Sequence, residues 1–282
     1  MITIKIAGVP EHFNLPWHLC IENGEFEEAG IDLQWTDVPE GTGKMCEMLR
    51  DGATDVAVIL TEGIVRDIEN GNPSMIVQEY VSSPLLWGIH VAYKSPYQTT
   101  DELQSTKIAI SRMGSGSHLM AVVHAKQKGW DPEQLHYEIV NTIDGAVEAL
   151  QNQKADYFMW EQFMTQPLVD QNIFRRLDTL PTPWPCFVIV ARKEWLEHEQ
   201  STLKLLLKTI NRTTSEFKSI PSIDRTLASR YLQKQEDIQS WLSKTQWSQK
   251  NLGGETLNKV QNELMSLGLI HKKSTFAEMV YQ

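Results

Sequence analysis

The sequence predicts an α/β protein with two similar lobes and a helical C-terminal segment. Apolar strand patterns alternate with amphipathic helix patterns from residue 2 to about residue 192, which is typical of sheets whose strands run mainly parallel. The segments EMLRDGATDV (Glu47 to Val56) and EALQNQKADY (Glu148 to Tyr157) share their Glu, Leu and Asp at matching positions. From Glu194 onward only helical patterns follow.

The first lobe is expected to contain four strands with helices between them. In chain order the patterns predict a strand over 2–8, a helix from about 17 to 30, a strand over 31–38, a helix opened by PEGTG and closed by Gly52, a strand over 56–60, a helix over 63–70 and a strand over 74–80. The helix before Gly52 carries Met45, Met48 and Leu49 on one face, and the glycine suits its C-terminal end. Ligands of such sheets bind beyond the carboxyl ends of the strands.

The second lobe is expected between two apolar strand-like segments, WGIHVAYK and CFVIVARK, which we interpret as the crossings between lobes. Lobe I then comprises residues 1–90 plus 189–282, and lobe II comprises 91–188. The shared Glu, Leu and Asp positions indicate either a true internal repeat or a chance similarity between two helix-strand units. The C-terminal helices, interrupted at Pro221 and at Gly253, are expected to fold back on the first lobe, with Trp241 and Trp247 in packing roles.

A Gly/Ser turn joins a strand and a helix within residues 107–129. The strand KIAIS is followed by MGSGSH and then by LMAVVHAKQKG, which has helical spacing. Backbone N–H groups and small hydroxyls at a helix N-terminus can bind an anion. The alternative is a plain turn in which Ser115 or Ser117 caps the helix. The turn lacks the Lys-Ser/Thr of a P-loop and the third glycine of a dinucleotide fingerprint.

Composition excludes several classes of function. The net charge is -10, the pI is near 5.3 and no Lys/Arg cluster occurs, so a nucleic-acid partner is not expected. Three scattered cysteines suggest no disulfide framework and no metal site. The apolar runs are too short to span a membrane. Because the N-terminus MITIKIAGVP resembles a strand and not a signal, we expect a cytoplasmic protein, or a periplasmic or lipid-anchored one if a signal was removed.

The order of several short motifs resembles a known family. EHFNLP follows the first strand, EGTG opens the second helix, DVAVILTEG spans the third strand, and MGSGSH and the strand after Asp156 come later. In this order they look like the type II periplasmic-binding-protein fold, and more narrowly its nitrate/sulfonate/taurine and thiamine-precursor branch, with signal-less fungal and bacterial members most similar. The resemblance covers nearly the whole chain. It implies two α/β lobes, each a mixed, mainly parallel sheet flanked by helices, that close on a small molecule, and it favours a monomer and admits an ABC-transporter permease as partner.

The resemblance also implies where a ligand binds. The implied ligand-binding residues are Glu11, His12, Phe13, Asn14, Gly41, Thr42, Gly43, Thr61 and Glu62 in the first lobe, Ser111, Gly114, Ser115, Gly116, Ser117, His118, Trp160 and Glu161 in the second, and Trp87, with Trp184 in addition, on the bridging strands. The helix N-termini suit a carboxylate, sulfonate or phosphate, whereas carboxylates beside aromatic rings suit a cationic or amino-heteroaromatic group. We therefore expect a small polar ligand with a ring or an amine, and no cofactor.

Each of these residues has a structural alternative. His12 and His118 are either ligand contacts or ordinary loop and cap residues. Glu62 follows an apolar strand directly, so its carboxylate needs a partner, which is either a ligand or the N-terminus of the next helix. Trp160 and Glu161 are either site residues or a half-buried aromatic and a solvated acid.

An enzyme on the same scaffold is the alternative function. The fold carries menaquinone-pathway enzymes, and a yeast thiamine-pyrimidine synthase whose cysteine-rich iron motif is missing here. A menaquinone-type reaction needs an acid or base in the cleft, for which His12, Glu62 or His118 could serve. The chain has no G-x-S-x-G, H-E-x-x-H or P-loop motif, so no catalytic residue is assigned and solute binding is the simpler hypothesis.

Overall fold

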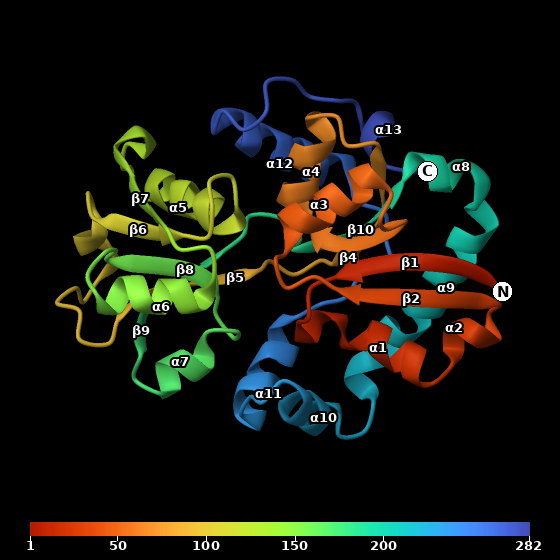
Figure 1. Ribbon diagram of the computed structural model, residues 1–282, viewed down its shortest axis with the longest axis horizontal. Coiled ribbons are helices and arrows are strands. Elements are labelled where there is room, and N and C mark those ends of the chain that lie inside the picture. Colours follow the sequence, from red (N-terminus) through yellow and green to blue (C-terminus); the bar gives the residue numbers. More distant parts are fainter. The chain divides into compact units, whose positions relative to one another are not determined.

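The structure is a computed structural model that describes all 282 residues. The chain divides into two compact units, of which unit 1 comprises Met1–Pro84 and Trp184–Gln282 and unit 2 comprises Leu85–Pro183. The chain therefore passes between units a few residues earlier than the sequence indicated. The reason is that the two apolar segments expected to be crossings are strands that belong wholly to one sheet each (Figure 1).

Unit 1 contains a five-stranded sheet in the order β2-β1-β3-β10-β4. Its strands are β1 (Ile2–Gly8), β2 (Ile31–Asp37), β3 (Val56–Leu60), β4 (Ser74–Val81) and β10 (Phe187–Arg192). β1 is parallel to β2 and β3, whereas β10 is antiparallel to both of its neighbours, β3 and β4. The sheet is thus mixed and mainly parallel, and its central strands are almost fully buried.

Helices cover both faces of this sheet (Figure 1). They are α1 (Leu15–Glu22), α2 (Glu25–Glu28), α3 (Thr42–Asp51), α4 (Thr61–Glu69), α8 (Lys193–His198), α9 (Gln200–Glu216), α10 (Ile223–Arg230), α11 (Gln235–Lys244), α12 (Gly254–Ser266) and α13 (Phe276–Met279). In Figure 1, α3, α4 and α12 lie on one face, and α1, α2 and α9 lie on the other. The C-terminal helices belong to unit 1, and Trp241 and Trp247 are buried in its core.

Unit 2 repeats this plan with the order β7-β6-β8-β5-β9. Its strands are β5 (Leu86–Ala92), β6 (Lys107–Ile110), β7 (His136–Ile139), β8 (Tyr157–Glu161) and β9 (Phe174–Pro181), and its helices are α5 (Gly116–Gln127), α6 (Ile143–Gln151) and α7 (Gln166–Asp170). β6 is parallel to β7 and β8, and β5 is antiparallel to β8 and β9. Short 3-10 turns complete both units: η1 (His12–Asn14), η2 (Thr100–Leu103), η3 (Pro132–Gln134) and η4 (Phe217–Ser219). The fold class expected from the sequence is confirmed.

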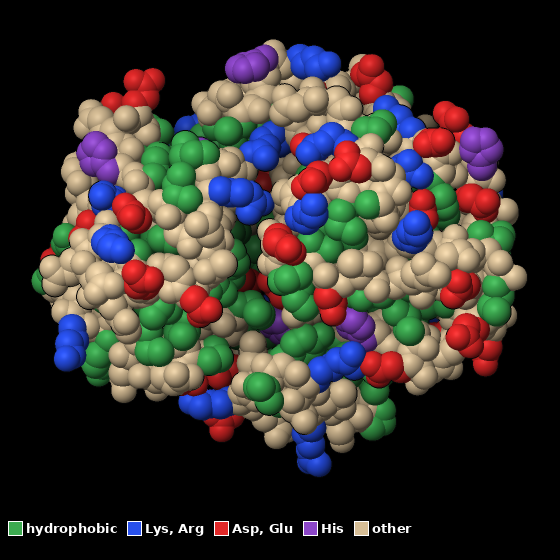
Figure 2. All heavy atoms as spheres, in the orientation of Figure 1, with side chains coloured by type: hydrophobic (Ala, Val, Ile, Leu, Met, Phe, Trp, Pro, Cys, Tyr) green, Lys and Arg blue, Asp and Glu red, His purple; other side chains and the backbone are tan.

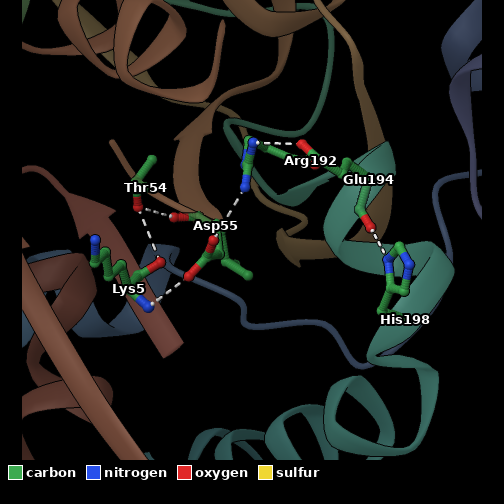
Figure 3. A network of polar contacts seen from close by, with 7 residues as sticks. Lys5, Thr54, Asp55, Arg192, Glu194 and His198 are labelled. Atoms are coloured by element: carbon green, nitrogen blue, oxygen red, sulfur yellow. Dashed lines mark hydrogen bonds and ion pairs between the residues drawn. The ribbon is translucent and has the colours of Figure 1, made fainter. Parts of the chain in front are cut away.

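The aspartates of the two similar segments occupy equivalent positions. Asp55 precedes β3, and its carboxylate accepts the backbone N–H of Lys5 at 3.0 Å (Figure 3). Asp156 precedes β8, and its carboxylate accepts the backbone N–H of Lys107 at 2.8 Å. Each aspartate therefore joins the central strand of its sheet to a parallel neighbour, β1 in unit 1 and β6 in unit 2. In unit 1 this link is extended by Arg192, which donates to Asp55 at 3.4 Å.

Two helix boundaries differ from the sequence expectation. The first helix is broken at Gly24, whose positive φ of 71° is a conformation that glycine adopts without strain, so α1 and α2 are separate. The helix after β3 begins at Thr61, two residues earlier than expected. Gly52 closes α3 in the left-handed conformation, as its position predicted.

No helix is both long and apolar enough to cross a membrane. The three cysteines are buried and form no disulfide bond. On the face shown in Figure 2, acidic and basic side chains are interspersed and no continuous basic patch is present.

Candidate functional site

The predicted first-lobe residues come together at one edge of the unit 1 sheet. β2, β1 and β3 are adjacent and parallel, so the segments that follow them emerge at the same edge. Residues 11–14 follow β1, Gly41 to Gly43 lead into α3 after β2, and Thr61 and Glu62 begin α4 directly after β3. β10 runs in the opposite direction and pairs Phe187 with Leu60, so its N-terminal end reaches the same edge.

Glu62 is a buried carboxyl group with one free oxygen. Its side chain is 2% exposed, and its Oε2 atom accepts the indole N–H of Trp184 at 2.8 Å. Its Oε1 atom is buried and has no hydrogen-bond partner. Desolvation by burial raises the pKa of Glu62 to about 7, against smaller lowering effects from its own backbone N–H, Trp184 and Arg66.

Two neighbours of Glu62 at this edge, Thr61 and Asn14, also have a buried oxygen atom without a hydrogen-bond partner. Thr61 is fully buried and its hydroxyl oxygen has no partner. Asn14 donates from its side-chain nitrogen to the carbonyl of Val9 at 2.8 Å, but its Oδ1 atom is buried and unpaired. Because buried polar atoms in folded proteins are nearly always hydrogen-bonded, unpaired atoms at the ends of two neighbouring strands mark a candidate binding surface.

His12 lies in an aromatic cluster. Its ring centre is 4.2 Å from that of Trp241 and 5.7 Å from that of Tyr231, and neither ring nitrogen has a hydrogen-bond partner. Burial lowers the pKa of His12 to about 3, so the imidazole is neutral at physiological pH. Phe13 extends the cluster to β10, with its ring 5.1 Å from that of Phe187.

Glu11 contributes a second carboxyl group whose charge is disfavoured. It is half-buried, and burial raises its pKa to about 7. The backbone carbonyl of Glu11 accepts the hydroxyl of Tyr231 at 3.3 Å, which ties the loop after β1 to the C-terminal helices. Neither Glu11 nor Glu62 forms an ion pair.

The segment from Gly41 to Gly43 has a structural role at the start of α3. Gly41 has a φ of 77°, and all three residues are half-buried. A Cβ atom on Gly63 would lie 2.2 Å from the methyl group of Thr42, so the first turn of α3 packs closely on that of α4. This contact places α3 beside the strand end that carries Glu62.

In unit 2 the Gly/Ser turn uses its polar side chains internally. The Ser115 hydroxyl caps α5 by accepting the backbone N–H of His118 at 3.3 Å. The Ser117 hydroxyl accepts the backbone N–H of Ser111 at 2.9 Å and contacts the Ser115 hydroxyl at 3.0 Å. His118 accepts the N–H of Gly114 through Nδ1, while Gly116 is the first residue of the helix. Ser115 is therefore the cap of α5, and ligand binding by this turn stays a prediction.

The other predicted residues of unit 2 lie on neighbouring strands. Trp87 on β5 is paired with Glu161 on β8, and the ring of Trp87 meets that of Trp160 edge-on at 6.3 Å. Glu161 is buried, and its Oε2 atom accepts the backbone N–H groups of Phe163 and Met164 at 2.9 and 2.7 Å. Its carboxylate thus holds the turn after β8. The indole nitrogen of Trp87 is buried without a partner.

Sequence reasoning missed the aromatic residues of unit 1 that lie far along the chain. Phe187 and Tyr231 were not expected at the site, and Trp241 was assigned a packing role only. The hydrophobic pattern of the C-terminal helices showed which residues are buried but not which strand end they cover. Phe187 lies at this edge because β10 pairs with β3, and the sequence carries no signal for that pairing.

Comparisons with known proteins agree with the fold of the chain. Residues 87–180 match the family described as Ca3427-like PBP. The Candida albicans CA3427 gene product, described as having the generic periplasmic binding protein fold, superimposes with a TM-score of 0.88 at 24% identity, covering 97% of this chain and 92% of that one. No curated protein matches the sequence.

Two sulfonate-binding proteins share the fold. The alkanesulfonate-binding protein SsuA from Xanthomonas axonopodis pv. citri, bound to MOPS, gives a TM-score of 0.83 at 15% identity and covers 100% of this chain and 98% of its own. The periplasmic aliphatic sulphonate binding protein SsuA from Escherichia coli gives 0.73 at 19% identity, with coverage of 100% and 92%. The chain therefore has the type II periplasmic-binding-protein fold, and its second unit matches the Ca3427-like family.

Proposed function

We propose that this chain is a solute-binding protein that holds a small polar ligand at the carboxyl edge of its sheets. The main support for this function is the set of buried, unpaired polar atoms on Thr61, Glu62 and Asn14 at the ends of β3 and β1. Leaving such atoms unpaired costs about 1–3 kcal/mol each, so a ligand that pairs with them gains that energy. The proteins of known ligand with the same fold support a binding function.

The proposed mechanism is closure of the two units around the ligand. Within unit 1, the unpaired polar atoms of Glu62, Thr61 and Asn14 lie at the same strand ends as the aromatic cluster of His12 and Phe13. A ligand that contacts both units favours the closed state by the difference between its affinities for the two states. The expected ligand is small and polar, with a ring, an amine or an anionic group, and is thiamine-precursor-like or sulfonate-like.

Mass spectrometry of small molecules released by denaturing the freshly purified protein tests this function. A single compound in stoichiometric amount is expected, and isothermal titration should then give saturable binding with one site. The Glu62→Gln variant should bind more weakly, whereas Glu197→Gln, at an exposed position on α8, should bind as the wild type does. A protein that releases no compound and binds no member of a panel of amines, sulfonates and aminopyrimidines is not a solute-binding protein.

One observation favours the enzyme alternative. A carboxyl group with a pKa of about 7, such as Glu62, is suited to proton transfer near neutral pH. His12, in contrast, stays neutral and is a weak base. An enzyme would convert the released compound, and Glu62→Gln would lower kcat far more than affinity. A compound returned unchanged after prolonged incubation supports binding alone.

Partner and compartment are further parts of the proposal. Several proteins of this fold serve ABC-type import, including a ligand-binding component from Staphylococcus aureus. Delivery to a permease, a monomeric state and a cytoplasmic location remain predictions for this chain. Light scattering on the purified protein checks the monomer, and fractionation of the source cells checks the location.

A further inference from the structure

We infer that the ligand presents a cationic nitrogen group, such as a protonated amine or a quaternary ammonium, to Glu62 and that it is not a simple sulfonate. This inference deepens the proposed function and rests on it. It differs from the ligand class named for the two SsuA proteins.

The unpaired oxygen atoms of Glu62 and Asn14 at the edge of unit 1 call for a positively charged or donor group, whereas the unpaired nitrogens of the aromatic cluster, on His12 and Trp241, include N–H donors. Asn14 Oδ1 can only accept hydrogen bonds, Glu62 Oε1 can only accept them once the carboxyl is ionised, and the Thr61 hydroxyl can accept as well as donate. A sulfonate or carboxylate offers further acceptors and would leave the first two atoms unpaired. A group that carries N–H donors or a positive charge complements them.

The structure also uses internally the groups that would attract an anion. The positive end of α4 is already faced by the carboxyl group of Glu62, which is stabilised by its own backbone N–H. In the Gly/Ser turn of unit 2, the hydroxyls of Ser115 and Ser117 accept backbone N–H groups of the same turn and contact each other at 3.0 Å, so that one of their two protons is already used. An incoming anion would therefore compete with contacts that already exist.

No cation of the chain neutralises the two carboxyl groups at this edge. Arg66, one turn after Glu62 on α4, is the only charged residue that perturbs Glu62, and its effect is the smallest of those acting on that group. An isolated buried carboxylate is expensive, and a cation placed against it recovers much of that cost. A ligand cation can supply the missing charge.

Aromatic side chains complete the surface that a cation prefers. The indole of Trp184 is hydrogen-bonded to Glu62, and Phe13 and Phe187 line the neighbouring strand ends. Cations are attracted to the faces of such rings, and this attraction strengthens when water is excluded. Carboxylate and rings together form a site typical of ammonium recognition.

Isothermal titration with choline, a primary alkylamine and MOPS, on protein refolded free of endogenous compound, tests the inference. Wild type should bind a cationic probe, and Glu62→Gln should lower that affinity at least about tenfold, as expected for loss of a charge-assisted contact. Glu197→Gln should leave it unchanged. Circular dichroism and the thermal midpoint of Glu62→Gln show whether the variant is folded, and Thr61→Ala provides a second, milder perturbation of the same surface.

The possible outcomes distinguish the preference for a cationic ligand from solute binding itself. If MOPS binds to wild type and Glu62→Gln binds it equally well or better, the cation inference is overturned while solute binding stands. A compound released from the native protein that contains no basic or quaternary nitrogen also overturns it. If no probe binds and no compound is released, the solute-binding function itself is refuted.

Discussion

Replacing Glu62 by Gln should change the pH dependence of stability in a direction that burial dictates. The pKa of Glu62 is raised from 4.5 to about 7. Between these two values the folded state keeps a proton that the unfolded chain has released. The contribution of the protonated Glu62 side chain to the free energy of unfolding is therefore complete below about pH 4.5. It is lost as the pH rises to about 7, by about 1.4 kcal/mol per pH unit.

This effect is measurable as a difference between two proteins. From about pH 5 to about pH 8, the wild type should lose about 3 kcal/mol of unfolding free energy relative to Glu62→Gln. Gln cannot ionise, and the constant cost of its buried amide cancels in the comparison. Urea unfolding followed by tryptophan fluorescence at both pH values gives the difference. If the difference in unfolding free energy between wild type and Glu62→Gln changes by less than about 0.5 kcal/mol between the two pH values, Glu62 is not a buried, unpaired carboxyl group.

Four further outcomes follow from individual contacts. The variants Asp55→Asn and Asp156→Asn should each lose about 1–3 kcal/mol in urea unfolding, with the larger loss at Asp55 because Arg192 then loses one of its two carboxylate partners and keeps only Glu194. Acidification from about pH 6.5 to 4 should destabilise the wild type by about 3 kcal/mol more than it destabilises His124→Phe. The reason is that burial lowers the pKa of His124 to about 4, so the unfolded chain takes up the proton before the folded chain does. Equal losses of stability in the two proteins on acidification would contradict this. Ser115→Ala should cost about 1 kcal/mol of stability through loss of the α5 cap, measured in the same way. Affinity for choline, whose charge is independent of pH, should fall about tenfold per pH unit below about pH 7 as Glu62 takes up a proton, and a flat titration profile would argue against contact with that group.

Much of the fold could be predicted from local patterns. The apolar run at 56–60 is the strand β3 to the residue, and Gly52 closes the helix before it. These features depend on the spacing of apolar side chains along the chain and on the left-handed conformation that glycine adopts. Both are determined by residues close together in the sequence. Asp55 and Asp156, which the two similar segments share, occupy equivalent positions in the two sheets.

Other features depend on contacts between distant parts of the chain. The hydroxyls of Ser115 and Ser117 appear identical in sequence whether they bind an anion or cap a helix, and only the structure shows that they bond within the turn. Burial of His12 depends on Trp241 and Tyr231, which are more than two hundred residues away in the chain. Glu62 could be identified from the sequence because it directly follows an apolar strand. A carboxylate at that position is buried and needs a partner, and the adjacent residues alone indicate this.

Native mass spectrometry of the freshly purified wild type beside Glu62→Gln shows whether the protein holds a small solute beside Glu62. The wild type should carry one bound compound of low mass with a cationic nitrogen, and the variant should have lost most of it, while Glu197→Gln keeps it. Equal occupancy of the wild type and Glu62→Gln, or a wild type free of ligand that also fails to bind any added amine, sulfonate or aminopyrimidine, would contradict it.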